Sequence, residues 1–167
     1  MKKLLTSRVL FLALILGLLS GCGFQLRGNI DLDPGLKRMH LQGVSQFSRL
    51  GINLRQALNS SGVEVVEKLA QSDAILRISN VKFDRRLLSV SSLSGKVNEY
   101  ELRYSFAVSL EDRKGKQLLA PKRLQQIRDY TYDEANVLGK GNEESRLRTE
   151  MEKDLVRQVL RRLQAKN

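Results

Sequence analysis

Glu99 and Glu101 are the two side chains whose spacing comes nearest to that of a catalytic pair. Both fall on one side of an alternating, strand-like segment, which would place them roughly 7 Å apart at ~3.4 Å per residue. Two carboxylates at such a distance can serve as general acid and base. Arg103 continues the same row, however, and no pocket-forming segment adjoins it, so the pattern favours a solvated strand face.

Other residues suited to catalysis are scarce. His40 is the single histidine, so a histidine-based metal cluster is excluded and only one imidazole base exists. Its neighbours Met39 and Leu41 favour a structural place within a strand. The run Gly139-Lys140-Gly141 lacks the glycine spacing of a phosphate loop, and no strand precedes it. We therefore expect a protein that is not an enzyme and has no metal and no cofactor.

Cys22, the only cysteine, follows an N-terminal segment typical of a secretory leader. Basic residues precede an apolar run, Val9 to Leu19, that is too short to span ~30 Å of hydrocarbon. The sequence Leu19-Ser20-Gly21-Cys22 resembles the lipobox of bacterial lipoproteins. The resemblance implies removal of residues 1–21 and three acyl chains on Cys22, which together form a lasting membrane anchor. An ordinary secretory leader with a chance cysteine is the alternative.

The residue after the cysteine indicates which membrane would hold the anchor. Gly23 stands where an Asp would indicate retention in the inner membrane, so similarity to lipoprotein sorting implies the periplasmic side of the outer membrane. Removal of Lys2, Lys3 and Arg8 with the leader lowers the formal charge from +11 to +8. Export separates this charge from nucleic acid and leaves membrane phosphates, lipopolysaccharide and acidic protein faces as partners.

Residues 22–35 are turn-rich and predict a lipidated tether and loop, and residues 36–167 predict one domain. A strand at 37–41, a helix capped by Ser48 and a strand at 63–66 form a βαβ-like start with parallel strands. Phe47 and Ile52 are spaced as a hydrophobic staple across the start of this helix.

The middle of the chain predicts long antiparallel strands. Apolar residues alternate with polar ones from 99 to 110, which indicates one buried and one solvated face. The alternation changes parity after Asn80, which predicts a bulge there. Turns are expected at 92–96 and 113–116. The segment 117–132, interrupted by Pro121, has the polar character of an edge strand. The polar residues predict an outer sheet face without an apolar patch.

The last helix is expected to begin near Asn142, with Glu143 and Glu144 in its first turn and basic residues at its C-terminal end. An apolar stripe with i+4 spacing predicts that one side of this helix is buried. Together these segments predict an α/β fold. It is a single-domain, two-layer sandwich with two helices packed on one face of a mixed four- to five-stranded sheet.

Three sequence segments resemble the lipopolysaccharide-assembly lipoprotein LptE family. These are Cys22-Gly23-Phe24-Gln25-Leu26-Arg27-Gly28, Val97-Asn98-Glu99-Tyr100-Glu101-Leu102 and the basic, leucine-rich last helix. The resemblance implies a plug within the LptD β-barrel that assists barrel assembly and binds lipopolysaccharide. A non-catalytic lipoprotein subunit of another envelope machine and a lipoprotein enzyme are the alternatives.

Candidate lipopolysaccharide contacts are basic residues near the long hairpin and near the last helix. They are Arg85, Arg86, Lys96 and Lys140, the last expected in the loop before the helix. Ammonium and guanidinium groups at exposed positions can pair with lipid A phosphates.

Overall fold

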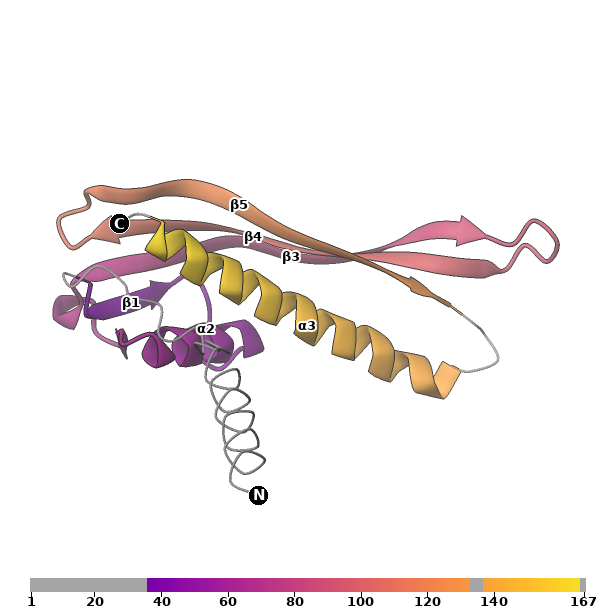
Figure 1. Ribbon diagram of the computed structural model, residues 1–167, viewed down its shortest axis with the longest axis horizontal. Helices are drawn as coiled ribbons and strands as arrows, with labels where there is room; N and C mark the ends of the chain where they lie inside the picture. Colours follow the sequence, from indigo (N-terminus) through magenta and orange to yellow (C-terminus); the bar gives the residue numbers. More distant parts are fainter. Residues whose placement is uncertain (1–35, 133–136, 166–167) are drawn as a thin grey trace, which may run out of the picture.

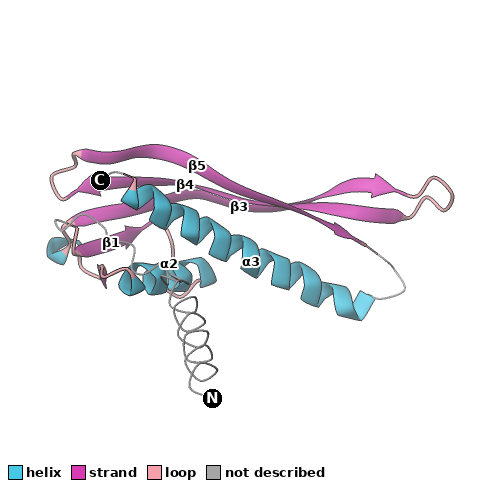
Figure 2. Cartoon of the chain, in the orientation of Figure 1, coloured by secondary structure: helices cyan, strands magenta, loops and turns pink. Residues whose placement is uncertain are grey.

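The computed structural model describes residues 36–132 and 137–165, and the predicted leader, Cys22 and the tether lie outside these ranges. The elements are β1 (Arg38–Gln42), α2 (Arg49–Ser60), β2 (Glu64–Val66), η1 (Leu69–Gln71), β3 (Ala74–Val90), β4 (Val97–Asp112), β5 (Gln117–Thr131) and α3 (Val137–Gln164). The strands form one mixed sheet in the order β2-β1-β3-β4-β5 (Figure 1). Both helices cover the same face of this sheet (Figure 2), which confirms the predicted fold class.

The first three elements form the predicted βαβ unit. β1 pairs in parallel with both β2 and β3, and the Ser48 side chain accepts a hydrogen bond from the Gly51 N–H at 3.1 Å. The hydrophobic staple was a wrong prediction, because the Phe47 and Ile52 side chains are 83% and 51% exposed. Helix α2 therefore depends on its hydroxyl cap and on its buried leucine stripe rather than on a staple.

The long strands match the predicted hairpins. β3 and β4 pair antiparallel with a register shift between Ser79 and Lys82, where Asn80 has a φ of 53°. This shift confirms the bulge expected from the change of parity. Among the strands that the structure describes, β5 pairs with β4 alone and lies at the edge of the sheet, as Pro121 and its polar neighbours predict.

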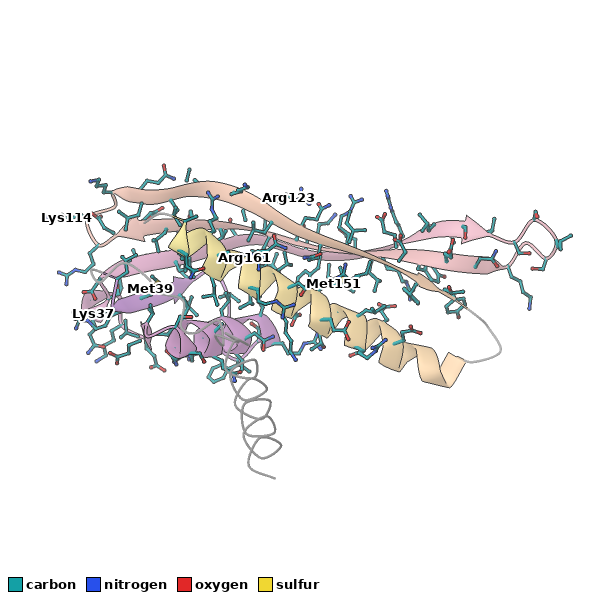
Figure 3. All side chains as sticks on the ribbon, viewed as in Figure 1. Lys37, Met39, Lys114, Arg123, Met151 and Arg161 are labelled. Atoms are coloured by element: carbon teal, nitrogen blue, oxygen red, sulfur yellow. The ribbon has the colours of Figure 1, made fainter. Side chains whose placement is uncertain are left out.

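The hydrophobic core lies between the sheet and the two helices. Met39 of β1 and Met151 of α3 (both labelled in Figure 3) are fully buried, as are Leu54 of α2 and Phe106 of β4. Each large apolar side chain buried in this way stabilises the fold by about 1.5–3 kcal/mol. The apolar residues of β4 with even numbers from 102 to 110 all face this core.

The opposite face of β4 is polar but is less solvated than the sequence predicts. Glu101, Ser105 and Ser109 are 8%, 1% and 6% exposed. Long side chains on the two neighbouring strands cover them, as where Arg123 of β5 donates a hydrogen bond to the Ser105 hydroxyl at 3.0 Å. A central strand of a sheet is thus shielded by its neighbours even on the face that no helix covers.

Helix α3 begins at Val137 rather than near Asn142. Glu143 and Glu144 therefore lie beyond its first turn, and Lys140 lies within the helix and not in a loop. Gly139 and Gly141 suggested a later start, since each costs ~1 kcal/mol in a helix, but the chain continues through them. The last turn carries Arg161 and Arg162, as predicted. Within the described residues, no helix is long and apolar enough to cross a membrane.

Candidate functional site

The outer face of β3, β4 and β5 carries a regular pattern of opposite charges. The pairing register places five basic and five acidic residues on this face: Arg77, Lys82, Arg86, Arg103 and Arg123 with Asp84, Glu99, Glu101, Glu111 and Asp129. Several of them form ion pairs across the strands, such as Arg77 with Glu111 at 3.2 Å. The face is therefore strongly polar and close to neutral.

Glu99 and Glu101, the two carboxylates with catalytic spacing, both have hydrogen-bond or ion-pair partners on this face. Glu101 lies 2.7 Å from Arg86 and 3.0 Å from Arg103, and the hydrogen bond from Arg86 holds the pKa of Glu101 below its usual range. Glu99 accepts a hydrogen bond from the Ser89 hydroxyl at 2.7 Å. A carboxylate paired with two guanidinium groups is a poor proton donor, so the geometry favours a structural role for the pair.

The adjacent candidates Arg85 and Arg86 point to opposite faces of the sheet. Arg86 belongs to the outer face, whereas Arg85 faces α3 and forms an ion pair with Glu144 at 3.0 Å. The Arg85 guanidinium also lies 4.7 Å from the centre of the Tyr100 ring. Both arginines thus have partners inside the domain, and their opposite directions follow from their adjacent positions in one strand.

Lys96 and Lys140 occupy different elements. Lys96 is exposed at the tip of the β3–β4 hairpin, and Lys140 lies in the first part of α3. Figure 1 places the hairpin tip and the start of α3 at the same end of the molecule. The four basic candidates therefore lie toward one end of the domain but do not form one compact cluster.

The hairpin also exposes apolar side chains that the sequence analysis did not anticipate. Leu87, Leu88 and Val90 are 52%, 44% and 52% exposed, and Leu93 at the tip is 99% exposed. This hairpin extends past the N-terminal end of α3 (Figure 1), so neither of the described helices covers its tip. The run of leucines beside a turn was the available sequence signal. By the pairing register, Leu87 lies opposite Tyr100 on the helix side of the sheet, so these leucines do not interrupt the polar outer face.

Taken together, the fold and its surfaces define a two-layer α/β domain, with a polar sheet face and one projecting, amphipathic hairpin. The family model described as "LptE: Lipopolysaccharide-assembly" matches residues 36–163, which is most of the chain. The chain therefore belongs to the LptE family of lipopolysaccharide-assembly proteins.

Individual relatives agree with this membership. The LPS-assembly lipoprotein LptE of Yersinia enterocolitica is 29% identical over 159 residues, which cover 93% of this chain and 75% of the relative. The solution structure of the uncharacterized lipoprotein B of Nitrosomonas europaea is similar, with a TM-score of 0.72 and 32% identity over 86% of this chain and 91% of that one. A minor lipoprotein of Acinetobacter baumannii has a TM-score of 0.64 and 28% identity, covering 78% and 92% of the two chains.

Proposed function

We propose that this protein is an outer-membrane lipoprotein that works in lipopolysaccharide transport to the cell surface as the plug and assembly factor of the LptD β-barrel. Membership in the LptE family supports a role in lipopolysaccharide transport, and two curated relatives carry the name LPS-assembly lipoprotein. Cys22 would carry the acyl chains that hold the domain at the periplasmic side of the membrane.

The observation that supports the plug most strongly is the outer sheet face. Its ten charged residues are balanced in sign, and the face has no helix over it (Figure 2). The interior wall of a large membrane β-barrel is polar, so a polar, neutral sheet can lie against it without burying unpaired charge. A docking face for a conventional protein interface would instead be expected to present an apolar centre.

Copurification tests this proposal. The tagged full chain, extracted with the outer membrane in mild detergent, should retain the LptD barrel as its main partner. Recovery of an unrelated envelope assembly in place of LptD would favour the alternative of a subunit of another machine. A full chain found in the cytosol with its leader uncut would contradict both.

The projecting hairpin is the proposed contact for lipopolysaccharide. Its exposed leucines suit acyl chains, and the Lys96 ammonium at the tip suits a lipid A phosphate. Lys140 would add a second cation at the same end of the molecule. Arg85 and Arg86 complete the proposed set of contacts, and a phosphate would have to share them with their ion-pair partners Glu144 and Glu101.

A charge-reversal series tests this contact. Lys96→Asp combined with Lys140→Asp should weaken lipopolysaccharide pulldown by tenfold or more at low salt, whereas the fold stays intact. Lys114→Asp is the matched control, because Lys114 is an exposed lysine in the other hairpin turn, at the opposite end of the sheet (Figure 3). Equal binding by the double variant and by the control would refute the assignment.

Labelling and mass measurements on the protein test the proposed lipid anchor. Radioactive palmitate should label the protein, and the label should be lost in Cys22→Ser. Intact mass should fit a chain that begins at Cys22 and carries three acyl groups. An unmodified thiol at Cys22 would contradict the proposed anchor.

A further inference from the structure

The end of the domain opposite the long hairpin is formed by several segments that meet. Figure 3 places Lys37 and Lys114 at this end, and Figure 1 shows the β3–β4 hairpin at the other. The Glu64 N–H donates to the Lys37 carbonyl at 2.8 Å, and Arg113 donates to the Ala70 carbonyl at 3.4 Å. The segments 36–38, 68–73 and 111–117, the start of β2 and the last turn of α3 form this surface, which we call the basic end.

The basic end carries an excess of positive charge. The last turn of α3 belongs to it, because Arg162 donates to the Ala120 carbonyl of β5 at 2.8 Å. Glu67 does not, because it lines a hollow with Leu41 and Val44 near the C-terminal end of β1. The net charge of the described residues is +4, half of the +8 of the mature chain. It comes from eight basic and four acidic side chains: Lys37, Arg38, Lys68, Arg113, Lys114, Lys116, Arg161 and Arg162 with Glu64, Asp73, Glu111 and Asp112.

Two of the four acidic side chains are engaged in ion pairs with arginines. Asp73 pairs with Arg38 at 3.0 Å, and Glu111 pairs with Arg77, further along β3, at 3.2 Å. The positive potential of the basic end is therefore set mainly by side chains that reach into solvent. The lysines of this surface are all exposed: Lys37, Lys68, Lys114 and Lys116.

The proposed lipid anchor joins the domain at the same end. Residues 22–35 separate Cys22 from Leu36, which directly precedes Lys37. Fully extended, these residues would span at most about 50 Å at ~3.3–3.6 Å per residue. The tip of the long hairpin lies beyond the other end of α3, whose 28 residues make it ~42 Å long. The acyl chains would therefore keep the basic end closer to the membrane than the hairpin.

We propose that the basic end docks on a bilayer surface that carries anionic phospholipids, and that the hairpin is thereby directed away from this bilayer. Acyl chains and a cluster of cations reinforce each other, because the chains hold the cations near the charged surface. Lysines suit this contact, since an ammonium on a flexible stem can follow mobile headgroups. Leu69, which is 49% exposed beside Lys68, adds an apolar contact. The inference rests on the proposed anchor at Cys22 and not on LptD or lipopolysaccharide.

Energy transfer from the domain to lipid headgroups measures which end lies near the bilayer. The acylated protein is reconstituted in vesicles of phosphatidylcholine, alone or with one third phosphatidylglycerol, that carry an acceptor dye on their headgroups. A donor dye is attached through Gln71→Cys at the basic end or Ser92→Cys at the hairpin, both exposed positions, while acylated Cys22 does not react. Phosphatidylglycerol should raise transfer from position 71 at least twofold but not from position 92, and high salt should cancel the rise. No rise at position 71, or an equal rise at position 92, would overturn the proposal.

Matched removal of charge tests whether the lysines are responsible. A triple variant at the basic end, measured with the dye at position 71, should lose at least half of the rise. A control triple removes three exposed lysines of β3, β5 and α3 and should keep the rise. Equal effects of the two triples would overturn the assignment, and circular dichroism confirms that both are folded. The substitutions are Lys37→Gln, Lys68→Gln and Lys116→Gln at the basic end and Lys82→Gln, Lys122→Gln and Lys153→Gln in the control.

Flotation distinguishes failure of this contact from failure of the anchor. The protein should float with phosphatidylcholine vesicles through its acyl chains alone. A protein that does not float contradicts the anchor at Cys22 and, with it, the contact. A protein that floats but shows no rise at position 71 contradicts the contact alone and leaves an acidic protein face as the partner of the lysines. LptD is absent from these vesicles, so neither outcome depends on the proposed plug.

Discussion

Arg85 on β3 and Glu144 on α3 form an ion pair at 3.0 Å, and the Tyr130 hydroxyl of β5 donates to the same carboxylate oxygen at 3.0 Å. Glu144 thus joins three elements. Among the α3 side chains that the structure describes, Met151 is the first that is fully buried, and Leu147 is only partly buried. The N-terminal part of α3 therefore depends on this polar contact more than on the hydrophobic core.

Glu144→Gln should loosen the start of α3 without unfolding the domain. Loss of the charge weakens the ion pair to Arg85, which is partly exposed, so we expect a cost of about 1 kcal/mol or less in global stability. Hydrogen exchange at the amides of residues 144–148 should rise several-fold, while exchange at residues 155–160 stays unchanged. Glu150→Gln, which breaks the exposed pair with Arg146, is the control and should change neither region.

Met151→Ala should destabilise the domain by about 2–5 kcal/mol, because it removes a fully buried side chain and leaves a cavity between α3 and the sheet. The free energy of unfolding, measured in urea by circular dichroism, tests this value. Lys153→Ala, two residues further and exposed, should change stability by no more than about 0.5 kcal/mol. Similar values for the two variants would contradict the position of the core.

Gly43→Ala should destabilise the domain more than an ordinary replacement of glycine by alanine does. Gly43 has a φ of 81°, and an added Cβ would lie 2.0 Å from the Ile78 carbonyl oxygen, so β1 and β3 would have to separate. Gly62→Ala is a matched control, because Gly62 has a φ of 80° and nothing lies within 4 Å of its added Cβ. The control should lose about 1–2 kcal/mol from the left-handed conformation alone, and Gly43→Ala should lose clearly more.

The lowered pKa of Glu101 predicts that the domain becomes less stable in acid. Its pKa lies below the ordinary value of 4.5, chiefly through the hydrogen bond from Arg86. As the pH falls below about 5, Glu101 becomes protonated in the unfolded chain before it does in the folded chain. The free energy of unfolding therefore decreases until the pH has passed below the pKa of Glu101 in the folded state. Glu101→Gln should flatten this fall in the unfolding midpoint as the pH drops below about 5. An unchanged pH profile in the variant would show that Arg86 and Arg103 do not stabilise the carboxylate.

The alternation of apolar residues made most of the sheet predictable from sequence. The strand at 99–110, the parity change at Asn80 and the edge position of 117–132 all depend on local patterns with a period of two. The helix start at Val137 was not predictable in this way, because two glycines and a missing cap residue indicated a later start.

Side-chain directions were harder to predict than strands. Arg85 and Arg86 are neighbours in one strand and therefore point to opposite faces, and the bulge at residues 79–82 decides which of them faces the helices. The ion pair between Arg49 and Glu152 joins residues 103 positions apart, and no local pattern links them. Exposure of Phe47 likewise depends on what α2 packs against and not on its spacing from Ile52.

Site-specific photocrosslinking tests most directly whether the polar sheet face lies against a barrel wall. Crosslinkers placed at Ser79 of β3 and Gln125 of β5, two exposed positions on the outer sheet face, should form adducts with LptD in intact outer membranes. Adducts should be weaker from Lys153 on the helix side. Crosslinks to LptD from Lys153 with none from Ser79 or Gln125 would contradict the account.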